Sequence, residues 1–167
     1  TLSMIETAIE LTGGRVSGEA IGEIVSWGKE LLAHPVELLD GVIETLDALS
    51  AGHQLVLITK GDLFHQESKV AESGLADLFD AVHIVSEKTS ATYREVLDRF
   101  DVAAPEFVMV GNSLASDVLP AVEAGCRGIH VPYSITWAME RVEAEPQPSW
   151  VRAESITEVP LILERWT

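Results

Sequence analysis

The sequence predicts an α/β fold with a Rossmann-like parallel sheet, preceded by a short all-helical segment. From residue 41 to residue 131, short apolar runs typical of buried strands alternate with amphipathic helical patterns. This alternation indicates βαβ units, whose strands are parallel and whose crossovers are right-handed. Residues 1–34 instead hold two helical patterns with no strand between them. We therefore expect two parts, residues 1–34 and residues 35–167.

The first part has the pattern of two helices. In residues 2–12 the apolar residues recur at helical spacing, and Gly13 ends the pattern. Ser17 is a suitable N-cap for a second helix. The step from His34 to Pro35 ends that helix, because the residue before proline avoids the helical region. An all-helical appendage is the expected result.

The second part is expected to contain five strands and five helices. Short runs rich in Val, Leu and Ile predict the strands, and segments with helical spacing predict the helices between them. Gly52, Gly74 and Gly125 end three of the helices. The strands are expected at residues 54–59, 81–85, 107–110, 128–131 and 150–153, and the helices at residues 41–50, 63–73, 89–100, 118–124 and 157–166.

Composition excludes several classes of partner. The chain has 167 residues and is 47% hydrophobic, so it can bury a core. Its 27 acidic and 11 basic residues give a formal net charge of −16, which argues against nucleic acid and anionic membranes because both need basic patches. The single cysteine, Cys126, excludes an internal disulfide. No apolar run is long enough to span a membrane. We expect a soluble, cytoplasmic enzyme that recruits a cation.

Chemically useful side chains follow three successive predicted strands. Thr59 ends the first strand, Lys88 follows the second, and Asn112 and Asp117 follow the third. In parallel sheets, ligands bind beyond the carboxyl ends of the strands. A hydroxyl can hold phosphate oxygens, a lysine can neutralise them, and a carboxylate with an amide oxygen suits Mg²⁺. Together these groups indicate a phosphoryl-transfer site.

Each of these residues also has an ordinary structural explanation. Thr59 is β-branched, as many strand residues are. Lys88 is of a type that is most often solvated in a loop. Asn112 and Asp117 are suited to an Asx-turn and to the N-terminus of a helix. It is the combination of the three positions that favours the phosphoryl-transfer hypothesis.

Three stretches occur in order within residues 41–131. They are Leu-Ile-Thr59-Lys-Gly-Asp, then Lys88, then Val-Gly-Asn112-Ser-Leu-Ala-Ser-Asp117 followed by Ala-Gly125. In this order and spacing the sequence resembles the haloacid dehalogenase superfamily, in its phosphatase-like branch with a helical cap. The resemblance implies a Rossmann-like core in residues 35–167. It also implies that residues 1–34 are the later part of the cap, which selects the substrate.

The resemblance implies a phosphate site at the first of these strands. Thr59 and the backbone amides of Lys60 and Gly61 would bind the phosphate. Lys88 would balance the charge of the phosphate and of the nucleophile. Because these groups come from different loops, the prediction requires that the loops meet at one edge of the sheet.

The resemblance also implies a Mg²⁺ site at Asn112 and Asp117. The family most often has aspartate where this chain has Asn112, and the amide removes one negative charge from the site. We expect Asp117, the only formal negative charge on this turn, to be the stronger ligand. The alternative is that Asp117 orients Lys88 or a bound water while Asn112 contacts the metal.

One element of the family is not found in the chain. The family begins with a strand that ends in Asp-x-Asp, whose first aspartate attacks phosphorus and whose second acts as acid and base. No such motif precedes residue 35. That strand is central in the family's sheet, between the strands that end here at Thr59 and Val110. We expect a fragment lacking this strand, with a nucleophile-free relative of the family as the second choice.

These observations predict a Mg²⁺-dependent phosphate-monoester hydrolase that works through an aspartyl-phosphate when complete and is inactive as residues 1–167. The alternatives are a 2-haloacid dehalogenase and a non-catalytic binding module. The expected partner is a small phosphorylated metabolite, together with either a missing N-terminal segment or a second copy in a homodimer. Four residues after the last clear strand are candidates to line the entrance, namely Tyr133, Thr136, Trp137 and Glu140, and for Trp137 a role as a packing anchor is the preferred interpretation.

Overall fold

The structure is a computed structural model that describes residues 1–134, 142 and 144–166, and the chain divides into two compact units, Thr1–Glu37 and Leu38–Thr167. Both predicted helices are present in the first unit, as α1 (Leu2–Leu11) and α2 (Gly18–Leu32). Ser17 caps α2 by accepting a hydrogen bond from the backbone N–H of Ala20 at 3.1 Å. The α/β character of the second unit likewise agrees with the prediction.

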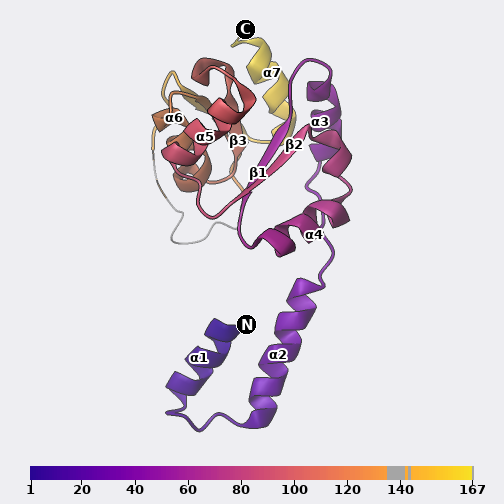
Figure 1. Cartoon of the computed structure of the whole chain (residues 1–167), viewed down its shortest axis with the longest axis vertical. Coiled ribbons are helices and arrows are strands. Elements are labelled where there is room, and N and C mark those ends of the chain that lie inside the picture. Colours follow the sequence, from indigo (N-terminus) through magenta and orange to yellow (C-terminus); the bar gives the residue numbers. More distant parts are fainter. Residues whose placement is uncertain (135–141, 143, 167) are drawn as a thin grey trace. The chain divides into compact units, whose positions relative to one another are not determined.

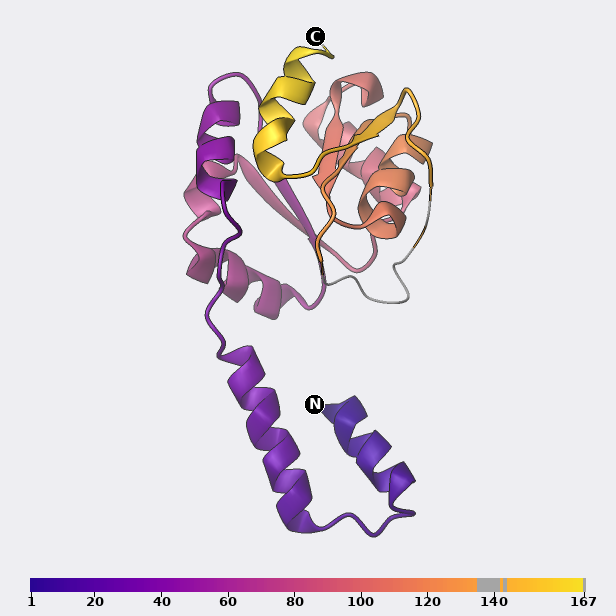
Figure 2. The ribbon, with the colours of Figure 1, turned by 180° about the vertical axis from the view of Figure 1, so that it is seen from behind.

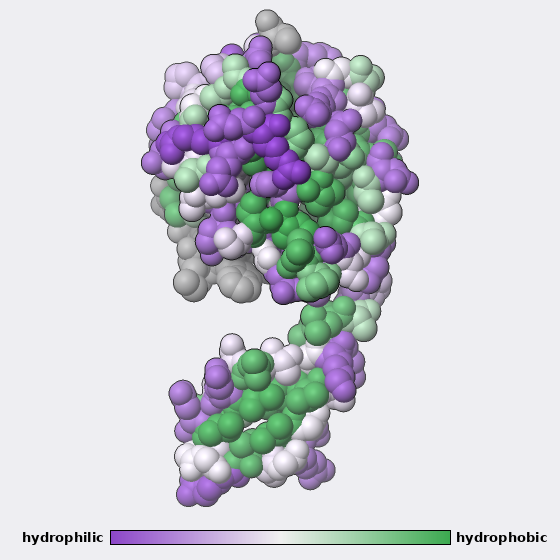
Figure 3. Space-filling view, viewed as in Figure 1, coloured by the Kyte–Doolittle hydropathy of each residue, from purple (hydrophilic) through white to green (hydrophobic). Residues whose placement is uncertain are grey.

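Many apolar side chains of the first unit are exposed, and few are fully buried. Ile24 and Gly28 are the buried residues of α2, and α1 has none. Thr1 occupies the space that a side chain at Gly28 would need, so the start of α1 packs closely against α2. Leu11 and Leu31 are exposed, and the space-filling view shows apolar surface along the two helices (Figure 3). Two helices of this length bury too little apolar area to form a core of their own.

The second unit carries the strands and the remaining helices (Figure 1). The strands are β1 (Val56–Lys60), β2 (Ala81–Val85), β3 (Val108–Gly111), β4 (Arg127–His130) and β5 (Trp150–Arg152), and the α-helices are α3 (Val42–Ser50), α4 (Leu63–Ser73), α5 (Ser90–Phe100), α6 (Leu119–Glu123) and α7 (Val159–Glu164). Single 3₁₀ turns precede β2, β3 and α7. In the described part of the chain, no helix is long and apolar enough to span a bilayer.

The helix after β3 begins earlier than expected. The sequence predicted residues 118–124, but a π-helical turn, Leu114–Val118, leads directly into α6. Ser113 caps this turn by accepting a hydrogen bond from the backbone N–H of Ser116 at 3.1 Å. The early start places Asp117 inside the turn rather than in a loop before the helix.

All the strand pairs are parallel, but the sheet is in two pieces. One piece has the order β1-β2 and the other the order β3-β4-β5. The described residues show a break between β1 and β3, and the missing family strand stays a prediction. Among the described residues, β1 pairs only with β2, and β3 pairs only with β4.

Packing on both faces shows that β1 and β3 belong to one core. On one face Ile58 of β1 and Met109 of β3 lie in the same buried cluster, which α5 covers with Tyr93, Val96 and Leu97. On the other face Leu55 and Val108 join a cluster with residues of α3 and α7. Figure 2, seen from behind, brings α7 and β5 to the front. The two half-sheets thus share a hydrophobic layer on each side although their edges are unpaired.

The backbone at the break is set up to pair with a further strand. The carbonyls of Phe107 and Gly111 accept hydrogen bonds from β4 and the residue after it, so Val108, between them, presents its N–H and C=O to the break. On β1, Leu55 accepts a bond from Asp80 beside β2, so Val56 faces the break. Val56 and Val108 are only half-buried. An extended parallel segment would satisfy both edges.

Gly128 on β4 gives a stability prediction. An added Cβ there would lie 2.7 Å from Val118 Cγ1 and 3.4 Å from Trp150 Cβ, and both neighbours are fully buried. Gly128→Ala is expected to lower the free energy of unfolding by about 1–3 kcal/mol, the usual cost of overpacking. Urea unfolding followed by circular dichroism measures it.

The matched control is Gly52→Ala. Gly52 follows α3, has no atom within 4 Å of an added Cβ, and does not have a positive φ angle. Its free energy of unfolding is expected to stay within about 0.5 kcal/mol of the wild type. Equal midpoints for the two variants would show that β4 has room beside Val118.

Candidate active site

The loops after β1, β2 and β3 are connected by two ion pairs at the carboxyl edge of the strands. Lys88 Nζ, from the loop after β2, lies 2.7 Å from Asp117 Oδ1 in the turn after β3. Lys60 Nζ, at the end of β1, lies 3.7 Å from Glu87 Oε2. The structure therefore brings Lys88 and Asp117 into direct contact, and it links the loop after β1 to the loop that carries Lys88.

The two ion pairs differ in their surroundings. The side chains of Lys88 and Asp117 are 13% and 6% exposed, whereas those of Lys60 and Glu87 are 40% and 71% exposed. A pair shielded from water has a strong Coulomb interaction, but each charge needs the other to offset its desolvation. An exposed pair contributes little. The Lys88–Asp117 pair is therefore the electrostatic centre of this edge.

The local structure after β3 fixes the Asp117 carboxylate. Its Oδ1 accepts a hydrogen bond from Lys88, and its Oδ2 accepts one from the backbone N–H of Ser113 at 3.0 Å. Gly111 lacks a side chain, and the carboxylate occupies the space where a Cβ would be. Asp117 is thus held by a turn of its own chain and by Lys88.

Two neighbouring ionisable groups stay neutral. Tyr93 is fully buried, and its hydroxyl donates a hydrogen bond to the carbonyl of Ser116 at 3.4 Å. Burial, and then the negative charge of Asp117, raise the pKa of Tyr93 well above its usual value. Burial also raises the pKa of Cys126 to about 11. Neither group is suited to nucleophilic or acid–base work at neutral pH.

Thr59 and the following turn form the other half of the site. Thr59 Oγ1 donates a hydrogen bond to Oε1 of Gln66 at 3.1 Å. Gly61 has a φ angle of +143°, which an L side chain rarely adopts. Asp62 caps α4 by accepting a hydrogen bond from the backbone N–H of His65 at 3.1 Å. A turn that opens a helix N-terminus is favourable for anions. The Gly61 N–H, however, already donates to the carbonyl of Val85 at 3.1 Å, and the phosphate-binding roles of Thr59, Lys60 and Gly61 stay predictions.

Asn112 and Asp117 do not complete a magnesium site by themselves. Both oxygens of Asp117 already accept a hydrogen bond, and Asn112 is exposed. Within the described ranges, no group of three or more His, Cys, Asp or Glu residues could hold a metal ion. Mg²⁺ prefers several oxygen ligands in an octahedron. The two residues fit Mg²⁺ only as part of a larger set, and their metal roles stay predictions.

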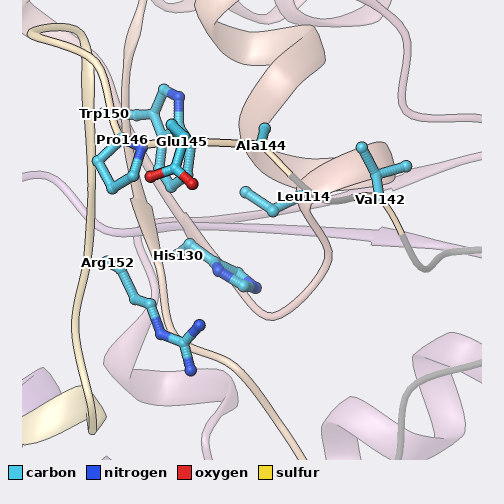
Figure 4. Close-up of a pocket in the computed structure, with 8 residues that line it drawn as sticks. All are labelled: Leu114, His130, Val142, Ala144, Glu145, Pro146, Trp150 and Arg152. Carbon is cyan, nitrogen blue, oxygen red and sulfur yellow. The ribbon is translucent and has the colours of Figure 1, made fainter.

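A pocket of about 560 Å³ lies beside the same turn, and the sequence did not indicate it. His130 and Arg152, the last residues of β4 and β5, extend into it from neighbouring strands (Figure 4). His130 Nε2 also lies 3.1 Å from the backbone carbonyl oxygen of Asn112. The signal that could have found these residues is their position, because both end strands at this edge. Of the expected entrance residues, Tyr133 is partly exposed, and Thr136, Trp137 and Glu140 lie outside the described residues.

Comparison with known proteins establishes the class of this protein. A family model described as haloacid dehalogenase-like hydrolase matches residues 11–125. The match covers more than half of the chain, and the α/β fold and the ordered loops agree with it. The chain belongs to the haloacid dehalogenase-like hydrolases.

Three similar proteins carry names that include two different activities. The chain is 29% identical over 118 residues to glyceraldehyde 3-phosphate phosphatase of Pyrococcus furiosus, covering 68% of this chain and 47% of the relative. A haloacid dehalogenase-like family hydrolase of Xanthomonas campestris is 45% identical, with a TM-score of 0.89, over 99% of this chain and 66% of that one. A 2-haloacid dehalogenase of Pseudomonas syringae is 25% identical, with a TM-score of 0.65, over 94% of this chain and 67% of that one.

The chain is shorter than these proteins. It spans about half the length of the phosphatase and two thirds of the length of the two hydrolases of known structure. One of these relatives is a phosphatase and another is a dehalogenase, so the similarities alone do not choose between the two reactions. What this chain shares with them is the family.

The Lys88–Asp117 pair gives a second prediction. Asp117→Asn keeps the shape of the side chain but removes the charge that offsets the shielded Lys88. We expect it to lower the free energy of unfolding by about 3 kcal/mol. Asn112→Ala, at an exposed residue just before the same turn, should change it by no more than about 0.5 kcal/mol. Urea unfolding of both variants measures the difference, and equal stabilities would show that Lys88 does not depend on Asp117.

Proposed function

We propose that this chain is part of a phosphate-monoester hydrolase that works through an aspartyl-phosphate and uses Mg²⁺. The observation that carries the proposal is the shielded Lys88–Asp117 pair, which fixes the position of the Lys88 ammonium at the edge where β1 and β3 also end. A phosphoryl group brings negative charge to such a site, and a preorganised ammonium stabilises it. The similarity to a glyceraldehyde 3-phosphate phosphatase supports the same reaction class.

The break in the sheet supports a position for the nucleophile between β1 and β3. A parallel strand seated between β1 and β3 would end at the same edge as Thr59 and Gly111. We propose that this chain belongs to a longer protein, the complete protein, and that the rest of that protein supplies the strand with an aspartate at its end. The aspartate oxygen forms a bond to phosphorus as the alcohol leaves. Water then cleaves the acyl phosphate and releases inorganic phosphate.

Each residue of the candidate site has a defined role in this proposal. Thr59 donates a hydrogen bond from its hydroxyl, and Lys60 donates one from its backbone N–H, to the phosphoryl oxygens. The Gly61 N–H already donates to the carbonyl of Val85 at 3.1 Å, so Gly61 contributes the shape of the turn. Lys88 neutralises charge on the phosphoryl group and on the aspartate. Asp117 fixes the position of the Lys88 ammonium. Because Lys88 is already held by Asp117, its ammonium needs little reorganisation during the reaction.

The proposed cofactor and substrate follow from the same arrangement. Carboxylates at the end of the proposed strand would complete an oxygen set with Asn112 and Asp117, and Mg²⁺ bound there supplies further positive charge. The proposed substrate is a small phosphorylated metabolite, since the strongly acidic chain is unsuited to nucleic acid. We propose that residues 1–34 belong to the cap that selects it.

The decisive test compares two lysine variants of the complete protein. Lys88→Ala is expected to reduce kcat on p-nitrophenyl phosphate with Mg²⁺ by about 100-fold or more, because a preorganised electrostatic group is lost. Lys60→Ala should change kcat only a few-fold, since its proposed contribution is a backbone N–H. Equal and small effects at both positions would refute the role of Lys88. Halide release from 2-chloropropionate, without phosphate release, would favour the dehalogenase.

Residues 1–167 assayed alone give a further prediction. We expect no turnover of p-nitrophenyl phosphate above the blank, because the described residues contain no aspartate at a strand end between β1 and β3. The complete protein, purified in parallel, is the positive control. Turnover that persists through a second purification and is lost in Lys88→Ala would mean that the nucleophile lies within the chain.

A further inference from the structure

Gln66 contacts both the Thr59 hydroxyl and the turn at Gly61, which are parts of the proposed phosphate site. Its Oε1 accepts a hydrogen bond from Thr59 Oγ1 at 3.1 Å. Its Nε2 lies against Gly61, 2.8 Å from the point where a Cβ on that glycine would be. The carboxamide therefore spans from the hydroxyl near the end of β1 to the turn that follows it.

The local backbone holds Gln66 in this place. Gln66 is in the first turn of α4, and its own N–H donates a hydrogen bond to the carbonyl of Asp62 at 3.0 Å. The side chain of Asp62 caps the same helix. A Cβ at Gly61 would meet the Gln66 amide, which is the flexible end of that side chain, so it is the φ angle of +143° that favours glycine here. The contact is thus built into the turn.

A hydroxyl has one proton, and its neighbour decides where that proton points. In the structure Thr59 donates this proton to Gln66. A carboxamide carries an acceptor on one side and two donors on the other. If the amide turns by 180°, its N–H donates to Thr59 Oγ1, and the hydroxyl proton is released toward an oxyanion. A carboxylate at the same place can only accept, and a thioether makes at most a weak hydrogen bond.

We propose that Gln66 is a positioning residue. When a phosphoryl group binds, the Gln66 amide turns over and donates to Thr59 Oγ1, which directs the Thr59 hydroxyl proton toward a phosphoryl oxygen. The inference rests on the proposed function, because it assigns Gln66 a part in the same anion site. Gln66 acts through Thr59, so its effect must disappear when the Thr59 hydroxyl is removed. A residue that merely packs against Gly61 would not show this dependence.

A double-mutant cycle on the complete protein tests the dependence. The variants are Thr59→Val, Gln66→Met and the combination, all close in shape to the wild type. The measured quantities are kcat and KM for p-nitrophenyl phosphate and the inhibition constant of inorganic phosphate. Gln66→Met is expected to raise the inhibition constant roughly 3- to 10-fold, the worth of one hydrogen bond. In the Thr59→Val background it should change the constant less than twofold.

A charge variant with a matched control completes the test. Gln66→Glu is expected to weaken phosphate more than Gln66→Met does, because the carboxylate retains the hydroxyl proton and repels the anion. Gln54→Glu adds the same charge at the exposed residue before β1, at the opposite end of that strand. It should leave the inhibition constant within twofold of the wild type.

The outcomes separate the inference from the proposed function. Equal factors for Gln66→Met in the two backgrounds would overturn the positioning role while leaving the phosphatase intact. Unchanged constants in Gln66→Met and Gln66→Glu would do the same. A wild type that neither turns over p-nitrophenyl phosphate nor binds inorganic phosphate would overturn both.

Discussion

The ion pair between Lys88 and Asp117 is the interaction on which the arrangement of this protein depends. Lys88 follows β2, in one piece of the sheet, and Asp117 follows β3, in the other. The pair therefore ties the two pieces together at their carboxyl edge, where no backbone hydrogen bonds join β1 to β3 in the described chain. Because the pair is shielded from water, separating the loops would leave each charge without the partner that offsets its desolvation, which costs free energy.

The break in the sheet is the second constraint. Apolar residues on β1 and β3, such as Val56 and Val108, are half-buried, although parallel strands at the centre of such a sheet are usually covered completely. Helix α5 covers one face of both pieces, and α3 and α7 cover the other. An added parallel strand between β1 and β3 would end at the same edge as the loops that hold Lys88 and Thr59.

The predicted elements and the predicted site agree with the structure to different degrees. The strands lie where their apolar runs predicted, because burial on both faces leaves a strong signal in sequence. The helix predicted at residues 118–124 begins earlier, in the π-helical turn at Leu114, which depends on the contacts of Asp117 rather than on helical spacing. Gln66, His130 and Arg152 were not predicted, because Gln66 contacts Thr59 across a turn, and His130 and Arg152 line one pocket from different strands.

The sequence by itself determined the fold class, the two helices of the first unit and the order of Thr59, Lys88, Asn112 and Asp117 along the chain. These depend on periodicity, on glycine and proline punctuation, and on spacing, all of which are local. Only the tertiary structure decided that Asp117 is bonded to Lys88 and to the Ser113 amide, and that Thr59 is bonded to Gln66. Partners of polar side chains depend on which strand ends are adjacent and on how tightly each turn packs, and local pattern carries no record of either.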